Sequence, residues 1–202
     1  MKKLYSQAGQ DKWVIEILKE KMNGFFLDIG AFDGVHISNT YALEKDFEWN
    51  GICMEADPET FKLLSEARSC KCVNQAISNE EGFFNFKRDG AGGEINKNGD
   101  CVVECKTLRS LLKEHNVPKL IDYISLDIEG HEFNALQEFP FDEYEFVLMT
   151  VEHNLYIGND TNKKNIKSIL EKNGYVIFKE NVCNVGNDPF EDWYINPKYI
   201  IL

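Results

Sequence analysis

The alternation of short apolar runs with amphipathic helical segments is the feature that most constrains this fold. Residues 25–29 and 51–55 read as buried strands, and the segment from Pro58 reads as a helix between two strands. This alternation predicts a parallel sheet with helices on both faces. Further expected elements are strands in 70–78, 121–128, 144–154, 175–181 and 192–202, with helices in 10–22 and 161–174. A short connection joins the last two strands and predicts an antiparallel pair at the sheet edge.

We expect one domain over residues 1–202, with an N-terminal helical segment at 1–24 and an insert at 82–106. The insert has strand-like ends and a middle rich in Gly, Asn and Asp. This composition predicts a hairpin whose mobile loop lies over a site.

Every predicted inner strand ends in polar residues, and in a parallel sheet these ends meet at one edge. Ligands of such sheets bind beyond the carboxyl ends of the strands. The polar strand ends are 28–34, Glu55 with Asp57, 74–78, Asp127 with Glu129, and Glu152 with His153.

The first of these ends, "FFLDIGAFDG", turns sharply at two glycines. Gly30 and Gly34 allow a tight turn and a close approach of a ligand to the main chain. A helix that begins there would offer free N–H groups to a carboxylate or phosphate. A plain strand-to-helix turn that needs glycine is the alternative.

Glu55 follows Gly34 by 21 residues, a position at which an acid can accept hydrogen bonds from both ribose hydroxyls. The third glycine of the dinucleotide-binding pattern is absent, since position 32 is Phe. A nucleoside with an amino-acid tail therefore fits better than a dinucleotide. An exposed carboxylate at a strand end is the alternative.

Asp127, Glu129 and Glu132 can bind a divalent cation through oxygen or take a proton from a hydroxyl. Helix capping by these acids is the alternative. His153 is a candidate general base, and Glu152 can orient it or bind a metal.

The chain resembles the FkbM-type S-adenosylmethionine-dependent methyltransferases. The matching pieces lie between residues 5 and 154 and occur in the family's order. They are "YSQAGQDKWV", "FLDIGAFDGVHISNTYALEK", "WNGICMEADPETFKLL", "NQAIS", "TLRSLL", "DYISLDIEGHE" and "VEHN".

The resemblance implies a class I methyltransferase fold, a Rossmann-like three-layer α/β sandwich. Its sheet has seven mostly parallel strands, and the last strand is antiparallel. It also implies S-adenosylmethionine as cofactor and methylation of a hydroxyl on a sugar or small metabolite. Carried onto this chain, it assigns cofactor contacts to Asp28, Gly30, Asp33, Gly34, Ser38, Asn39, Glu55, Asp57, Gln75, Ala76 and Asp127. Catalysis would fall to His153, Asp127 and Glu152, and these three would also be the ligands of a Mg²⁺ ion.

The composition of the chain limits the kinds of partner that we expect. Net charge is −12 without a Lys/Arg block, so we expect no nucleic acid partner, and the acceptor is a small molecule or glycan. We expect a cytoplasmic protein with no membrane segment and with six reduced cysteines. The sequence leaves the oligomeric state open.

Three other functions remain open at this stage. They are a nicotinamide-dependent oxidoreductase, a catalytically silent methyltransferase fold that serves as a binding module, and a nitrogen- or protein-directed methyltransferase.

Overall fold

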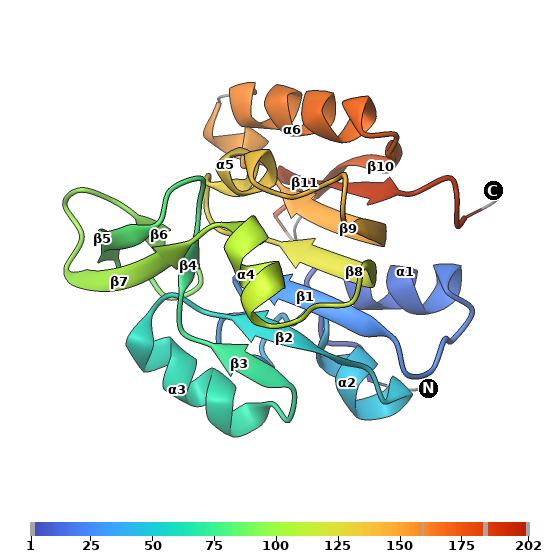
Figure 1. The fold of residues 1–202 in the computed structure, drawn as a ribbon, viewed down its shortest axis with the longest axis horizontal. Coiled ribbons are helices and arrows are strands. Elements are labelled where there is room, and N and C mark those ends of the chain that lie inside the picture. The colour runs from blue at the N-terminus through green and yellow to red at the C-terminus, as the bar shows by residue number, and fades with distance from the viewer. Residues whose placement is uncertain (1–2, 159, 184–185, 201–202) are drawn as a thin grey trace.

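The main sheet of the protein has seven strands in the order β10-β11-β9-β8-β1-β2-β3 (Figure 1). The computed structural model describes residues 3–158, 160–183 and 186–200. The strands are β1 (Phe25–Ile29), β2 (Asn50–Met54), β3 (Lys71–Val73), β8 (Leu120–Leu126), β9 (Glu145–Glu152), β10 (Val176–Cys183) and β11 (Pro189–Ile195).

Only β11 runs against its neighbours in this sheet. It pairs antiparallel with both β9 and β10, whereas the other neighbouring strands pair in parallel. This confirms the predicted seven-stranded, mostly parallel sheet with an antiparallel last strand. Asp28 is in register with Cys53 of β2 on one side and Ser125 of β8 on the other. The carboxyl ends of the three central strands are therefore level and open onto the same side.

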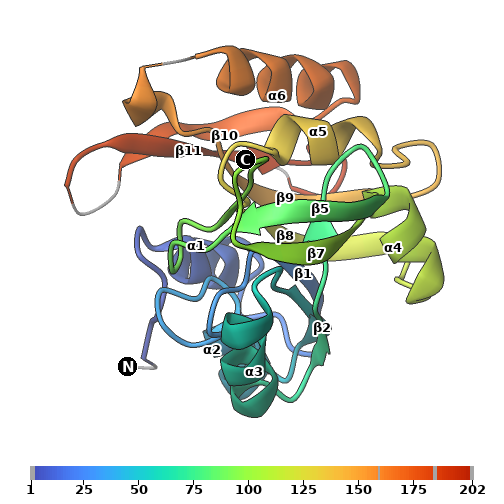
Figure 2. The same ribbon diagram turned by 90° about the vertical axis from the view of Figure 1, so that its left-hand side faces the viewer.

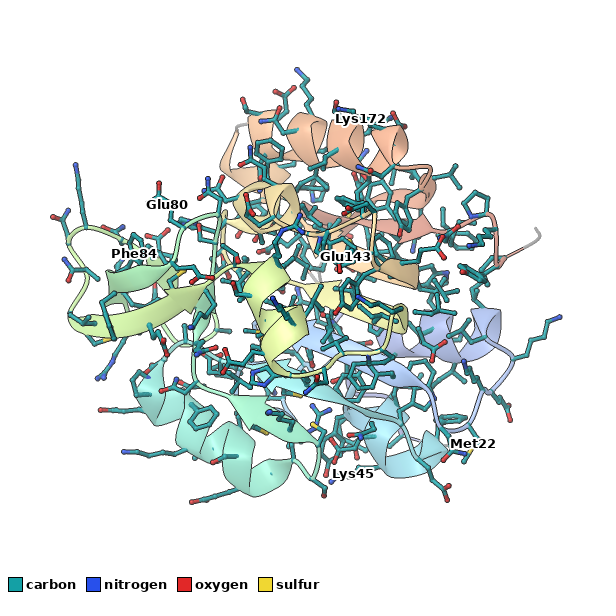
Figure 3. The ribbon with its side chains drawn as sticks, viewed as in Figure 1. Met22, Lys45, Glu80, Phe84, Glu143 and Lys172 are labelled. Atoms are coloured by element: carbon teal, nitrogen blue, oxygen red, sulfur yellow. The ribbon has the colours of Figure 1, made fainter. Side chains whose placement is uncertain are left out.

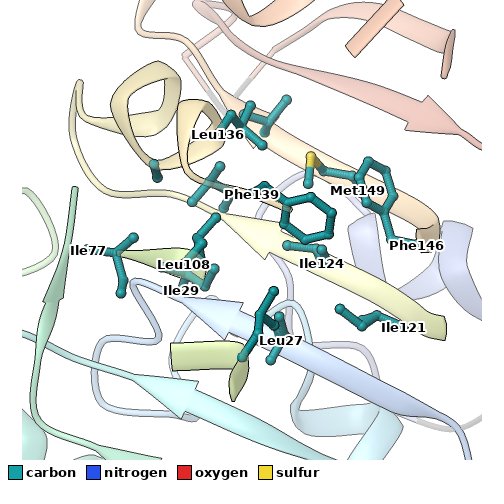
Figure 4. Close-up of a cluster of buried hydrophobic side chains, with 14 of the residues drawn as sticks. Leu27, Ile29, Ile77, Leu108, Ile121, Ile124, Leu136, Phe139, Phe146 and Met149 are labelled. Atoms are coloured by element: carbon teal, nitrogen blue, oxygen red, sulfur yellow. The ribbon is translucent and has the colours of Figure 1, made fainter. Parts of the chain in front are cut away.

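Helices cover both faces of the sheet (Figures 1 and 2). Successive strand residues point to opposite faces, so Phe26 packs in one buried cluster and Leu27 in the other. The cluster with Leu27 packs against α4, α5 and α6 (Figure 4). The cluster with Phe26 contains Trp13, Leu43 and Leu64 from the other three helices. The helices are α1 (Gln10–Ile17), α2 (Tyr41–Phe47), α3 (Pro58–Ala67), α4 (Leu108–Glu114), α5 (Glu132–Gln137) and α6 (Thr161–Lys172), with a 3₁₀ turn η1 (Leu155–Ile157).

A second sheet lies beside the carboxyl ends of the main one, with strand order β4-β7-β5-β6. Its strands are β4 (Ala76–Ile77), β5 (Gly82–Lys87), β6 (Glu94–Ile95) and β7 (Cys101–Lys106), and Phe84 marks this sheet in Figure 3. The single strand predicted for 70–78 is therefore wrong. The segment breaks after Val73 because Ala76 and Ile77 pair with β7 instead of continuing beside β2.

Two predicted helices are shorter than the sequence pattern indicated. The first ends at Ile17 because Lys19 and Glu20 have positive φ angles of 53° and 55°, which turn the chain. The helix after the glycine corner begins only at Tyr41, and Phe32 and Ile37 also have positive φ. The expected helix N-terminus beside Gly34 is therefore absent.

The six cysteines are free thiols, and five of them lie on strands, as predicted. Cys70 is the exception and precedes β3. Within the described ranges, no helix has the length and apolar character needed to cross a membrane.

Candidate functional site

An open cavity lies at the carboxyl ends of β1, β2 and β8, with an empty volume of about 950 Å³ that includes the solvent space at its mouth. Residues of the insert sheet and of the N-terminal segment complete its wall. Eight of the predicted cofactor-site residues line it: Asp28, Gly30, Ser38, Asn39, Glu55, Gln75, Ala76 and Asp127.

The turn after β1 forms the cavity floor. Gly30 has a φ of +90°, and the N–H groups of Gly30 and Ala31 both donate to the Met54 carbonyl, at 3.1 and 2.8 Å. These two hydrogen bonds hold the turn against the end of β2. Gly34, with a φ of +80°, packs against α3, where a β-carbon would come within 2.6 Å of Leu64. Gly34 does not line the cavity.

Asp28 lies at the buried end of β1 and accepts a hydrogen bond from Thr40 at 2.5 Å. Burial raises the pKa of Asp28, and the Arg68 guanidinium 3.9 Å away opposes this shift. Arg68 is also buried and binds Thr40 and Glu44. Asp28 therefore holds the segment after β1 through Thr40 and also lines the cavity.

Glu55 and Asp57 have different surroundings although they are two residues apart. Glu55 lines the cavity, and one of its oxygens accepts the Asp57 N–H at 2.8 Å. Burial raises the pKa of Glu55 to about 7, with a contribution from the nearby charge of Asp57. Asp57 does not line the cavity; it caps α3 through the Glu59 N–H and lies 3.3 Å from Arg88.

Two amide side chains present unused hydrogen-bonding groups in the cavity. Asn39 donates to Ser125 at 2.9 Å, and Gln75 donates to Glu104 at 2.9 Å. The amide oxygens of Asn39 and Gln75 are buried and accept no hydrogen bond among the described residues. Since a buried acceptor without a donor is costly, both oxygens indicate a polar ligand.

The other polar residues of the turn after β1 mainly hold the backbone. Asp33 accepts hydrogen bonds from the N–H groups of Val35 and His36 and does not line the cavity. Ser38 lines the cavity, but its hydroxyl accepts from Thr40 and Tyr41.

Three carboxylates meet at the ends of β8 and β9. One oxygen each from Asp127, Glu129 and Glu152 lies within 4.8 Å of the others. Burial raises the pKa of all three, to about 7 for Glu129, and their mutual charges raise those of Glu129 and Glu152 further. One Glu152 oxygen is buried without a hydrogen-bond partner in the described ranges.

Two residues of the predicted ligand set, Asp127 and Glu152, lie together in this cluster. The third member is Glu129, whose backbone has a positive φ of 56°. Asn154 donates to Glu129 at 3.4 Å.

His153 lies away from the cavity, with 1% of its surface exposed. Its Nδ1 accepts the Leu155 N–H at 3.2 Å, and its Nε2 faces Asp192 of β11 at 3.3 Å. The structure thus places both ring nitrogens against protein groups, where neither can reach a ligand in the cavity. Its predicted roles as direct base and metal ligand do not fit this position.

Sequence reasoning gave little weight to three other polar cavity residues. His131, at the start of α5, lies 3.3 Å from the Ser78 hydroxyl, and burial lowers its pKa. Gln7 and Gln10 come from the N-terminal segment, where Asp11 holds the chain through the N–H groups of Tyr5 and Ser6. Gln7 and Gln10 thus bring the N-terminal segment to the wall of the cavity.

The insert also reaches the cavity. Phe86, Gly90, Ala91, Gly93 and Ile95 all line it. The loop of the insert therefore borders the cavity.

The strand order, the level strand ends and the cavity beyond them define a class I methyltransferase fold. Comparison with known proteins agrees: the Methyltransferase FkbM domain matches residues 28–177. The chain belongs to the FkbM methyltransferase family. No curated protein matches the chain.

Solved structures support the fold. A methyltransferase FkbM from Methylobacillus flagellatus KT is 13% identical with a TM-score of 0.54, over 87% of this chain and 44% of that chain. Thus this chain spans less than half of the Methylobacillus protein. A precorrin-6y C5,15-methyltransferase from Geobacter metallireducens GS-15 is 13% identical with a TM-score of 0.50, over 92% and 84% of the two chains.

A third structure contains a ligand. The magnesium protoporphyrin IX methyltransferase ChlM from Synechocystis PCC 6803, solved with bound S-adenosylmethionine, is 9% identical with a TM-score of 0.55. The match covers 92% of this chain and 76% of that chain. Identities this low carry the fold and nothing further about substrates.

Proposed function

We propose that this protein is an S-adenosylmethionine-dependent methyltransferase that methylates a hydroxyl group of a sugar or another small metabolite. The observation that carries the proposal is the cavity at the ends of β1, β2 and β8 in a member of the FkbM family. At one side it presents Glu55, Asn39 and Gln75, and at the other Asp127 and Glu129, which belong to the acidic cluster that Glu152 completes.

The cavity residues suit the parts of an adenosyl amino acid. Glu55 would accept hydrogen bonds from the two ribose hydroxyls. The unpaired oxygen of Gln75 matches the exocyclic amine of adenine, and that of Asn39 matches the ammonium of the methionine part. Gly30 lines the cavity and carries no side chain, so a ligand can approach its main chain. The hydrogen-bonding groups of the cavity are therefore chemically suited to those of the cofactor.

Bound S-adenosylmethionine would supply a methyl group activated by a positively charged sulfur. The protein's tasks would be to align the acceptor oxygen and to remove its proton. Asp127 and Glu129 line the cavity, and the pKa of Glu129, about 7, suits a group that takes a proton near neutral pH. His153 would act only by positioning the end of β9.

The acidic cluster also fits a divalent cation. Asp127, Glu129 and Glu152 offer only oxygen ligands, and one oxygen of Glu152 has no partner among the described residues. Mg²⁺ held there would lower the pKa of an acceptor hydroxyl. No ion pair in the described ranges joins the three carboxylates to a basic side chain.

The test is transfer of a tritiated methyl group from S-adenosylmethionine to a panel of free sugars, glycosides and hydroxylated aromatic compounds, with and without Mg²⁺. We expect label in an alkali-stable ether of at least one hydroxyl compound. Labelling of basic peptides alone would favour the nitrogen- or protein-directed alternative. Binding of the cofactor with no transfer to any acceptor class would favour the silent binding module.

A further inference from the structure

Three cysteines lie at β2 and β3, on the face of the sheet that α3 covers. Cys53 is buried on β2, and its register partner on β3 is Cys72. Cys70 lies in the turn between α3 and β3 and is partly exposed. The sulfurs of Cys53 and Cys70 are 3.5 Å apart.

Cys70 has surroundings that favour its thiolate. Hydrogen bonds from the thiols of Cys53 and Cys72 lower the pKa of Cys70, and the positive charge of Arg68 lowers it further. Burial and the charge of Glu44 oppose this shift. For Cys53, burial raises the pKa, so this thiol keeps its proton. The pair therefore combines a partly exposed thiol whose pKa is lowered with a buried thiol whose pKa is raised.

We propose that Cys70 is an oxidation site for hydroperoxides and that Cys53 resolves the oxidised form into a reversible Cys53–Cys70 disulfide. This site is separate from the methyl-transfer chemistry, and no part of it depends on the proposed function. A thiolate beside a guanidinium and a second thiol within van der Waals distance are the two parts that such a redox pair needs.

The chemistry balances with the hydroperoxide as oxidant. The Cys70 thiolate attacks one peroxide oxygen, the O–O bond breaks, and a sulfenic acid forms while the leaving oxygen takes a proton. The Cys53 sulfur then attacks the Cys70 sulfur, and the S–O bond breaks. Water leaves with the Cys53 proton. The two sulfurs together lose two electrons, and a thiol reductant reverses the step.

Bridging would act on the wall of the cavity through Arg68. A disulfide needs its sulfurs at about 2.05 Å, so they must approach each other. Cys53 is fixed in a central strand, whereas Cys70 lies two residues after Arg68 in a turn. Arg68 binds the Gly34 carbonyl at 3.2 Å and the Thr40 hydroxyl at 2.9 Å. Movement of Cys70 toward β2 therefore loosens the segment from Gly34 to Thr40.

Trypsin separates the three cysteines, which makes the bridge directly measurable. Cleavage at lysine and arginine puts Cys53 in 46–62, Cys70 in 69–71 and Cys72 in 72–87. The folded protein is treated with hydrogen peroxide, its remaining thiols are alkylated under denaturing conditions, and the peptides are analysed by mass spectrometry without reduction. We expect 46–62 linked to 69–71. A link between 69–71 and 72–87, or an unmodified Cys70 in a sample where Cys183 is oxidised, would overturn the proposal.

Matched cysteine variants distinguish a loss of thiol reactivity from a loss of folding. In Cys53→Ala, Cys70 should stop at the sulfenic acid, which dimedone traps, and in Cys183→Ser the bridge should form as in the wild type. Cys70 should react with iodoacetamide at pH 7 at least about tenfold faster than the exposed Cys183. Equal rates would contradict the assignment of Cys70 as the reactive thiol.

The effect of the disulfide on the cavity wall can be measured without a bound ligand. Hydrogen exchange of 34–40 should become faster on oxidation of the wild type and stay unchanged in Cys70→Ser. Identical exchange in the reduced and bridged wild type would show that Arg68 does not transmit the change.

Discussion

A β-carbon placed on Gly30 would lie 1.7 Å from the main-chain oxygen of Asp127. The turn after β1 and the end of β8 are thus in direct contact. The Asp127 N–H also donates to the carbonyl of Ile29 at 3.0 Å. The turn of the cavity floor and the acidic cluster are therefore two parts of one site, and neither can move far without the other.

Comparison of Gly30→Ala with a control glycine should show how much the close contact with Asp127 contributes beyond the cost of a positive φ angle. Gly174 has nearly the same φ, +87° against +90°, but an added β-carbon meets nothing within 4 Å. Gly174→Ala should cost about 1–2 kcal/mol of stability. Gly30→Ala should cost clearly more and weaken binding of S-adenosylhomocysteine at least about a hundredfold. Urea denaturation and calorimetry measure both effects, and equal losses in the two variants would show that the contact is relieved at little cost.

Binding of S-adenosylhomocysteine should strengthen as pH rises from 6 to 8. Burial raises the pKa of Glu55 to about 7, so Glu55 is mostly protonated at pH 6 and mostly ionised at pH 8. If only the carboxylate holds the ribose hydroxyls, affinity changes by up to about tenfold over this range. Glu55→Gln should bind weakly and lose this dependence. A wild-type affinity independent of pH would contradict the role of Glu55.

Mg²⁺ should raise the melting temperature more at pH 8 than at pH 6. The folded pKa values of Asp127, Glu129 and Glu152 are raised above their unfolded values, so the folded protein binds more protons. Stability therefore falls as pH rises from about 4.5 through 7, and a bound cation offsets the loss where the carboxylates are ionised. The rise in melting temperature caused by Mg²⁺ should disappear in Glu129→Gln. Shifts of equal size at both pH values, or in both proteins, would argue against a cation site.

His153→Ala should destabilise the protein by about 2–4 kcal/mol and leave the affinity for S-adenosylhomocysteine within about threefold. The substitution leaves a cavity and removes the imidazole that faces buried Asp192. Urea denaturation and calorimetry test the two parts. A variant with wild-type stability and a strongly reduced methyl-transfer rate would instead support the direct catalytic role that the sequence suggested.

The sequence predicted the frame of the site because strand ends are local features. The run from Phe25 to Ile29 is apolar except for Asp28 and is followed by a glycine, so its strand and its turn were both readable. The same holds for Glu55, which directly follows β2 and lines the cavity. These are residues whose position depends on their own strand.

Residues whose position depends on the turn conformation were less predictable. His153 follows β9 directly and faces β11, and its orientation follows from pairing with a strand nearly forty residues later. Glu129 belongs to the acidic cluster and has a left-handed backbone, a conformation that the sequence pattern does not indicate. Asp33 and Asp57 resemble ligand-binding acids in the sequence, but their oxygens accept backbone N–H groups of their own turns.

The most direct test of the central claim is a calorimetric titration of the protein with S-adenosylhomocysteine, repeated with Glu55→Ala and with the surface control Glu66→Ala. The account predicts micromolar or tighter binding by the wild type and by Glu66→Ala. The Glu55→Ala variant should bind at least about tenfold more weakly, because two hydrogen bonds to a charged group are lost. A folded wild type that does not bind, or a Glu55→Ala variant with unchanged affinity, would contradict the account.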